Sequence, residues 1–191
     1  MQKRFVVVSG LPGSGKTTLG RQLAPLLGLT LIDKDDVLEG FFESRGTGDD
    51  AWRRALSRES DRVFQSQAAA SAGAVLVSFW HQPGMATDSG TPTSWLAELS
   101  ALVVNVHCTC SGEVAATRFL QRKRHAGHLD RRATFAEVVT SLRTLEQHRP
   151  IEVGPRVTVD TQTEPNLAGL VGEIGLAFAR CQPSGCSPPI P

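Results

Sequence analysis

The sequence predicts an α/β protein, a single three-layer domain in which a five-stranded parallel sheet carries helices on both faces. Three observations predict this fold class. Short apolar segments rich in β-branched residues alternate along the chain with segments of helical periodicity. The first apolar segment, 4–8, is continuously hydrophobic, as expected of a strand buried on both faces. The length of 191 residues suits one globular domain, and the sequence has no internal repeat.

Five segments have the composition of buried strands. They are residues 4–8, 30–32, 74–79, 102–106 and 156–159. Between them, apolar side chains recur at spacings of three and four residues, which predicts helices. The predicted helices cover 16–27, 37–44, 52–72, 95–99, 114–124 (after an N-cap at Ser111), 135–145 and 167–178. Residues 81–94, rich in Pro, Gly, Thr and Ser, are expected to form a loop. Helices between successive strands imply right-handed crossovers and therefore a parallel sheet.

Composition excludes several classes of protein. Hydrophobic residues make up 40% and charged residues 20%, which is too apolar for a disordered chain and too polar for a membrane protein. The net charge of +1 argues against a dedicated duplex-DNA binder but leaves a local basic site open. The four cysteines show neither zinc-site spacing nor a need for a disulfide framework, and no secretory pattern follows 4–8. We expect a reduced, cytoplasmic protein, monomeric or homodimeric, with one domain over 1–179 and a flexible Pro-rich tail over 180–191.

The loop after the first strand carries the strongest functional signal. It reads Gly10-Leu11-Pro12-Gly13-Ser14-Gly15-Lys16-Thr17, followed by Thr18. This is the G-x-x-x-x-G-K-[ST] pattern in its strand–loop–helix context. The glycines permit backbone conformations in which successive N–H groups converge on phosphate oxygens, and the helix N-terminus adds positive charge. The residues expected to bind nucleotide here are Gly10, Gly13, Ser14, Gly15, Lys16, Thr17 and Thr18, with Lys16 between the β- and γ-phosphates and Thr17 on Mg²⁺.

Carboxylates follow the second strand, in the sequence Ile32-Asp33-Lys34-Asp35-Asp36. In a parallel sheet, ligands sit beyond the carboxyl ends of the strands, so an acid here faces the γ-phosphate end of the loop. One carboxylate can orient an acceptor hydroxyl and take its proton, and another can help to hold Mg²⁺. We expect Asp36 to be the N-cap of the following helix and Asp35 to have the functional role.

Other users of this loop fit less well. Switch GTPases carry an Asn-Lys-x-Asp element, which is absent from the sequence, and remodelling ATPases carry an acid at the end of an apolar strand, where this chain has Val77-Ser78-Phe79. The loop and the Asp-Lys-Asp-Asp run together resemble the small P-loop kinases often described as AAA-family ATP-binding proteins. Relatives in that group include chloramphenicol phosphotransferase, gluconate and shikimate kinases, and the 5′-kinase domain of polynucleotide kinase. The resemblance implies a three-layer P-loop NTPase fold, Asp35 as the base for the acceptor hydroxyl, and Asp33 as its Mg²⁺-side or substrate-side companion. The absence of an acid at Ser78 departs from many relatives and leaves the holding of Mg²⁺ open.

A basic cluster at about 117–132 is expected to form a helical lid. Arg118, Arg122 and His125 are spaced to share one helical face, and Gly127 offers a hinge. Protein cations that stabilise the transferring phosphoryl group make the main catalytic contribution of a kinase. The resemblance implies that Arg118 packs on adenine and that Arg122 contacts phosphate.

The same resemblance places adenine against the loop after the last strand, so residues 160–163 are expected to border the base, and Thr161 is a predicted nucleotide contact. Arg124, His125 and His128 are further lid candidates.

The acceptor pocket is expected between 37–72 and the loop after the third strand. Arg54, Trp80, His81 and His125 are candidate substrate contacts beside Asp35, because the sheet edge brings these segments together. Arginines would suit an anionic acceptor, and a Trp-lined pocket an aromatic or hydrophobic alcohol.

The predicted protein is therefore an ATP- and Mg²⁺-dependent kinase acting on a hydroxyl of a small molecule, with Lys16, Asp35 and Arg122 as catalytic residues. A polynucleotide 5′-hydroxyl kinase and a nucleotide-dependent regulatory ATPase remain alternatives, so a nucleic-acid acceptor stays open.

Overall fold

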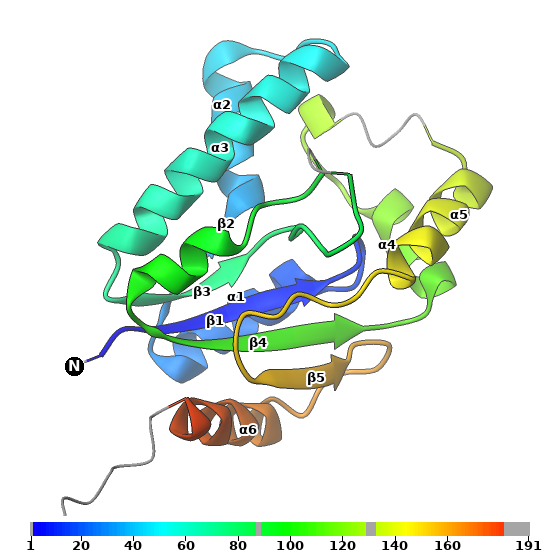
Figure 1. Ribbon diagram of the computed structural model, residues 1–191. Coiled ribbons are helices and arrows are strands. Elements are labelled where there is room, and N and C mark those ends of the chain that lie inside the picture. The colour runs from blue at the N-terminus through cyan, green and yellow to red at the C-terminus, as the bar shows by residue number, and fades with distance from the viewer. Residues whose placement is uncertain (1, 87–88, 129–132, 182–191) are drawn as a thin grey trace, which may run out of the picture.

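The computed structural model describes residues 2–86, 89–128 and 133–181. Its centre is a parallel sheet of five strands in the order β2-β3-β1-β4-β5 (Figure 1). The strands are β1 (Arg4–Gly10), β2 (Thr30–Asp33), β3 (Gly73–Val77), β4 (Leu102–Thr109) and β5 (Arg156–Asp160). β1 lies at the middle, paired with β3 through Val6↔Val75 and with β4 through Val6↔Val104. The predicted fold class, a P-loop NTPase-type α/β fold, is confirmed.

The helices are α1 (Lys16–Leu27), α2 (Lys34–Arg45), α3 (Asp50–Ala70), α4 (Gly112–Gln121), α5 (Phe135–Glu146) and α6 (Leu167–Arg180), with short 3₁₀ turns η1 (Ser94–Leu99) and η2 (Ala126–His128). The segment predicted as a helix at 95–99 is therefore a 3₁₀ turn. The predicted tail over 180–191 lies outside the described residues beyond Cys181. No helix in the described part of the chain is both long and apolar enough to cross a membrane.

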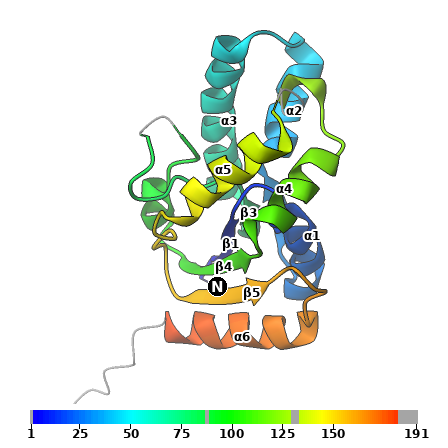
Figure 2. The same ribbon diagram turned by 90° about the vertical axis from the view of Figure 1, so that its right-hand side faces the viewer.

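Alternating side chains of the central strands build two cores. Val6 and Val8 of β1 point to one face of the sheet, where they meet Leu23 and Ile174. α1 and α6 cover this face (Figure 2). Their neighbours on β1, Phe5 and Val7, point to the opposite face, which is covered by α3 and η1. There they meet a cluster of aromatic side chains, namely Phe64, Trp80 and Trp95. Burial on both faces is what a continuous apolar strand requires.

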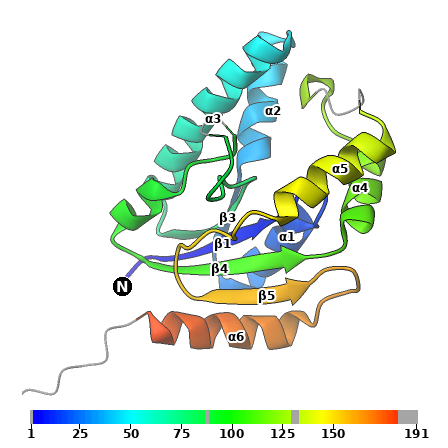
Figure 3. The ribbon, with the colours of Figure 1, turned by 45° about the vertical axis from the view of Figure 1, so that its right-hand side comes forward.

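Two helical pairs stand at the carboxyl end of the sheet. Figure 3 shows α2 and α3 rising above the sheet on one side and α4 and α5 on the other. Small clusters hold each pair together, Leu38 with Phe42 and Leu56 in the first, and Ala115 with Leu142 in the second. The loops that follow the strands lie between these two helical pairs. The predicted functional residues are therefore placed there.

α2 begins at Lys34, earlier than the predicted 37. The Asp33 side chain accepts a hydrogen bond from the Asp35 amide at 3.0 Å and so caps the helix. The expectation that Asp36 is the N-cap is therefore wrong, because Asp36 lies in the first turn and pairs with Arg21 on the surface at 3.6 Å. An extended Asp33 at the end of β2 is already in the backbone conformation that a cap needs.

Candidate nucleotide and acceptor site

The loop between β1 and α1 has the shape of a phosphate cradle. Gly10, Gly13 and Gly15 all have positive φ, at 134°, 80° and 84°. A Cβ on Gly13 would lie 2.1 Å from the Ala115 carbonyl oxygen, so the close approach of α4 to the loop also requires glycine. α1 begins after Gly15 without a side-chain cap and without an acid in its first turn. Its first amides and its positive end are thus left for an anion.

Lys16 is folded back into this loop. Its Nζ donates hydrogen bonds to the carbonyl oxygens of Gly10 at 2.9 Å and Leu11 at 2.6 Å. Burial lowers the pKa of Lys16 to about 8. An incoming phosphate would supply the negative charge that this buried ammonium lacks, and would favour its charged form.

Thr17 and Asp33 form the point at which the loop meets the second strand. The Thr17 hydroxyl donates to Asp33 Oδ2 at 2.8 Å, while Asp33 Oδ1 caps α2. Burial, and then the neighbouring Asp35 charge, raise the pKa of Asp33 to about 6, although the hydrogen bonds from the Asp35 amide and Thr17 lower it. A hydroxyl and a carboxylate are hard oxygen donors of the kind that Mg²⁺ takes, together with phosphate oxygens and water. These two residues therefore fit the predicted metal role without an acid at Ser78.

Asp35, the candidate base, stands in the first turn of α2 in ion-pair contact with Arg124. Burial raises the pKa of this carboxyl, but the charges of Arg124, Arg122 and Lys16 outweigh burial and hold the pKa below its usual value. Asp35 is consequently ionised at neutral pH. The loop, the second strand and the lid region thus converge on one carboxylate, although they lie far apart in sequence.

Arg118 joins the loop after β5 to the phosphate loop. Its Nη2 donates to the carbonyl oxygen of Thr161 at 2.9 Å, and Thr161 Oγ1 donates to the Ser14 carbonyl oxygen at 2.8 Å. A Cβ on Gly15 would lie within 4.0 Å of both Arg118 and Thr161. Three predicted nucleotide-binding segments are therefore in contact: Arg118 of α4, Thr161 of the last loop and the phosphate loop.

The lid does not continue as a helix. α4 ends at Gln121, and Arg122 follows in an extended conformation with ψ 138°, so Arg118, Arg122 and His125 do not share one helical face as predicted. Arg122 stacks over the Phe119 ring at 4.2 Å, yet its charge still influences the pKa values of Lys16 and Asp35. Beyond Gln121 the chain leaves the axis of α4, and Arg124 contacts Asp35 of α2.

The tip of the lid rests on α2. The His125 ring stacks on Phe42 with 5.2 Å between centroids, and a Cβ on Gly127 would lie 2.6 Å from the same ring. His128 is buried, and its Nε2 lies 2.8 Å from Glu39 Oε1. Burial, and then Arg124, lower the pKa of His128. The predicted lid residues 129–132 lie outside the described residues, so the lid is described only up to His128.

The acceptor side contains one clear correction. Trp80 is only 2% exposed, packs between Phe64 and Trp95, and donates from Nε1 to the Val8 carbonyl oxygen at 2.9 Å. It is a core residue and cannot line a pocket. A tryptophan at the end of an apolar strand fits both interpretations, and only its packing decides between them.

Other predicted acceptor residues are placed differently. His81 is half-buried, with Nδ1 2.7 Å from the Ser89 carbonyl oxygen, so it holds the loop after β3. Arg54 is exposed on α3, whereas the adjacent Arg53 is half-buried and its Nε is enclosed without a hydrogen bond. The structure thus favours Arg53 over Arg54 as the arginine directed inward.

A buried polar network behind this region was missed by sequence reasoning. Lys34 pairs with Asp61 of α3 at 2.6 Å, Asp61 accepts from Thr91 Oγ1 at 2.8 Å, and Thr91 Oγ1 lies 2.6 Å from Ser78 Oγ. The network ties the start of α2 to α3 and to the loop after β3. Its signal in the sequence is an acid on the mainly apolar buried face of α3, one turn before the buried Phe64.

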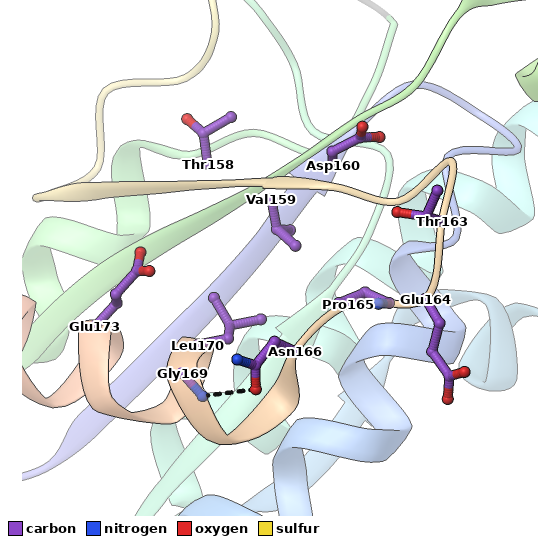
Figure 4. Close-up of a pocket in the computed structure, with 10 residues that line it drawn as sticks. All are labelled: Thr158, Val159, Asp160, Thr163, Glu164, Pro165, Asn166, Gly169, Leu170 and Glu173. Carbon is purple, nitrogen blue, oxygen red and sulfur yellow. Dashed lines mark hydrogen bonds between the residues drawn. The ribbon is translucent and has the colours of Figure 1, made fainter.

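A separate hollow of about 290 Å³ lies between β5 and the start of α6 (Figure 4). Asn166 caps α6 there by accepting from the Gly169 amide at 3.1 Å. Asp160 and Thr163, from the loop expected to border adenine, line this hollow, whereas Thr161 does not, and we assign the hollow no role.

Known proteins share this arrangement to different extents. A family model described as an AAA domain matches residues 5–148. A putative kinase from Chloroflexus aurantiacus j-10-fl superposes with a TM-score of 0.78 at 26% identity, over 93% of this chain and 99% of that one. The shikimate kinase from Bacteroides thetaiotaomicron superposes with a TM-score of 0.54 over 94% of this chain and 99% of that one, and at 18% identity it shows the fold alone.

Sequence similarity to curated proteins is local. The shikimate kinase of Paracidovorax citrulli (strain AAC00-1) is 53% identical over 45 residues, which make up 19% of this chain and 25% of the relative. The chain thus spans about a quarter of the length of that relative. Because the family model covers most of the chain, the chain belongs to the AAA-domain family, and the resemblance to small P-loop kinases that the loop predicted is confirmed.

Proposed function

We propose that the protein is a kinase that transfers the γ-phosphoryl group of ATP, with Mg²⁺, to a hydroxyl of a small molecule. The observation that carries the proposal is the position of Asp35. It is an ionised carboxylate at the start of α2, within the electrostatic reach of Lys16 and held by Arg124 of the lid. A regulatory ATPase needs no such acceptor-side carboxylate.

The chemistry assigned to each residue follows from its surroundings. Lys16 turns from the Gly10 and Leu11 carbonyl oxygens toward phosphate, and the amides at the start of α1 bind the same group. Thr17 and Asp33 would hold Mg²⁺, which when bound neutralises charge on the phosphate oxygens. Asp35 orients the acceptor hydroxyl and receives its proton. Transfer through a loose transition state demands little of the base, so a carboxylate with a low pKa suffices.

Arg124 and Arg122 give the lid its part in the reaction. Arg124 contacts Asp35, so an acceptor that reaches Asp35 displaces or shares this cation. A displaced Arg124, together with Arg122, is then available to the transferring phosphoryl group, where positive charge stabilises the transition state. Arg118 and Thr161 stay on the nucleotide side.

The acceptor class is suggested by similar proteins. The relatives and fold neighbours carry names such as shikimate kinase and gluconokinase, whose acceptors are small and hydroxylated. The inward-directed Arg53 would favour an acceptor that also carries an anionic group. We therefore place hydroxy acids first among candidate acceptors.

The test is ADP release from Mg·ATP across pooled hydroxyl compounds, which include shikimate, D-gluconate, sugars, nucleosides, hydroxyl-bearing antibiotics and 5′-hydroxyl oligonucleotides. We expect one pool to stimulate release and one compound in it to gain a phosphate by mass. Asp35→Asn should lose roughly 10²-fold or more of this turnover and still bind ATP. The matched control is Asp36→Asn, which removes an exposed carboxylate one position later and should retain turnover.

Three results would change the proposal. Stimulation by the oligonucleotides alone indicates a polynucleotide 5′-hydroxyl kinase. Retained turnover in Asp35→Asn removes Asp35 as the base. ATP binding without stimulation by any pool moves the regulatory ATPase ahead.

A further inference from the structure

Three polar side chains on the carboxyl halves of β1 and β4 have no part in the proposed reaction. Ser9 precedes Gly10 of the phosphate loop and is paired in register with His107 of β4. Asn105 lies two positions earlier on β4, so all three side chains point to the same face of the sheet. That face is the one covered by α3 and the loop after β3, which are segments expected to form the acceptor pocket.

Their hydrogen bonds fix the position of every proton in the group. Asn105 is fully buried and donates from Nδ2 to the Ile151 carbonyl oxygen at 3.2 Å, so its Oδ1 faces Ser9 as an acceptor. Ser9 Oγ donates its one proton to that Oδ1 at 2.7 Å. Ser9 Oγ also lies 2.9 Å from His107 Nδ1, and because its proton is already used, it must accept there. His107 is therefore protonated on Nδ1.

The other ring nitrogen is left as a lone-pair acceptor. Burial, and then the charges of Arg156 and Lys16, lower the pKa of His107, so the ring is neutral at physiological pH. Within the described part of the chain, Nε2 makes no hydrogen bond, and it is not sealed from solvent. A ring whose only role was to satisfy Ser9 would not need an accessible second nitrogen, since Ser9 already has Asn105.

The chemistry of this nitrogen selects its partner. A lone pair repels phosphate oxygens, which also carry lone pairs, so Nε2 does not suit the nucleotide. It suits a group that donates a proton, and a hydroxyl is such a group. The phosphate loop begins at Gly10, directly after Ser9, and Ser9 is paired with His107. His107 therefore lies at the end of the sheet where an acceptor would approach the phosphates.

We propose that His107 Nε2 accepts a hydrogen bond from a second hydroxyl of the acceptor, distinct from the hydroxyl that Asp35 activates. This inference rests on the proposed kinase function. Ser9 and Asn105 act as positioning residues, because they set the tautomer that leaves Nε2 unprotonated. The enzyme would accordingly prefer acceptors with at least two hydroxyls, of which one is read and one is phosphorylated.

The proton position can be measured without any acceptor. Protein labelled with ¹⁵N-histidine should show His107 as a neutral imidazole with Nδ1 protonated at pH 7.5, and Ser9→Ala should lose this preference. A wild-type His107 that is charged, or protonated on Nε2, overturns the proposal.

Kinetics with a panel compound that wild-type protein phosphorylates, for example shikimate or D-gluconate, test the contact. His107→Leu should raise the KM for that acceptor by roughly tenfold and leave the KM for ATP unchanged, and His107→Gln, which keeps an acceptor atom, should recover part of the loss. The deoxy analogue that lacks the hydroxyl in question should be phosphorylated equally by wild-type protein and His107→Leu. His148→Leu, at a half-buried histidine just beyond α5, is the matched control.

The outcomes separate the two proposals. If His107→Leu leaves the KM values for the acceptor and for ATP unchanged, the His107 contact is overturned. The kinase function still stands in that case. Failure of wild-type protein to phosphorylate any compound counts against the kinase, and the ¹⁵N measurement then still decides whether Nε2 is the unprotonated nitrogen.

Discussion

The ion pair between Lys34 and Asp61 offers a quantitative test of how the start of α2 is anchored. Lys34 follows the N-cap of α2, and its Nζ lies 2.6 Å from Asp61 Oδ1 on α3. The two side chains are only 9% and 13% exposed. Thr91 Oγ1 donates to the same carboxylate oxygen at 2.8 Å, and Lys34 also donates to Ser57 Oγ at 3.2 Å. Both charges are thus desolvated and have few other partners.

Replacing one partner should cost much more than replacing both. Lys34→Met leaves the buried Asp61 carboxylate with the Thr91 hydroxyl alone, and an uncompensated buried charge costs about 3–5 kcal/mol. The double variant Lys34→Met/Asp61→Asn removes both charges and keeps an oxygen for Thr91. It should recover most of that loss, because the desolvation cost of both ions disappears with them. Domains of this size have total free energies of unfolding of about 5–15 kcal/mol, so the single variant is readily detected.

Urea unfolding at pH 7.5 measures these free energies. The matched control is Arg45→Met, which breaks a pair with Glu59 of similar length, 2.7 Å, whose side chains are 45% and 39% exposed. That loss should be much smaller than the loss in Lys34→Met, since solvent screens the exposed pair. If Lys34→Met costs no more than Arg45→Met, water reaches the Lys34 pair and the reasoning from burial is refuted.

Three further predictions concern the site itself. Burial raises the pKa of Asp33 from 3.8 to about 6, so the ionised carboxylate destabilises the fold. This loss of stability is absent below pH 3.8, grows between pH 3.8 and 6, and is complete above pH 6. Asp33→Asn should therefore raise the free energy of unfolding in metal-free buffer at pH 7.5 by about 1–3 kcal/mol, with no gain below pH 3.8; urea unfolding showing a loss at pH 7.5 contradicts this. Gly13→Ala, with φ 80° and the Ala115 carbonyl oxygen 2.1 Å from the new Cβ, should abolish ATP binding in calorimetry and lower the melting temperature, and normal ATP affinity would count against the close approach. Gly127→Ala places a Cβ 2.6 Å from the Phe42 ring, so acceptor turnover should fall while ATP binding persists; unchanged turnover means that the lid need not rest on α2.

Local sequence patterns predicted the elements of the fold well, because each signal is contained in a short stretch. The β-branched run at 4–8 and the glycine-rich loop behind it are local features, and the structure has a buried strand and a left-handed glycine turn there. Ser111 accepts from the Val114 amide and caps α4 as predicted, which is again a contact between near neighbours. Helix ends were less predictable: α4 ends at Gln121 and Arg122 is extended, although the helical spacing continues to Arg124 in the sequence.

Side chains whose roles depend on distant partners could not be assigned in this way. Trp80 has the same local sequence whether it lines a pocket or packs on Phe64, and only the fold of α3 decides this. The contact of Arg124 with Asp35 joins the lid to the first turn of α2, and neither the helical-face argument nor the phosphate contact that the resemblance implied for Arg122 predicted it. Periodicity reports which face a residue occupies on its own element, but it carries no information on what that face meets.

The same limit explains why the acceptor side is harder to interpret than the nucleotide side. Phosphate is bound by backbone amides of one continuous loop, so the sequence that makes the loop also makes the site. In the proposed reaction, the acceptor side is assembled from separate elements: Asp35 on α2, Arg124 beyond α4 and His107 on β4. Each of these residues can be substituted without altering the phosphate loop. Each is also held by a partner on another element, as His107 is by Ser9. A scaffold of this kind can keep its phosphoryl donor while the acceptor changes, which is why substitutions at these positions should alter the KM for the acceptor and leave that for ATP in place.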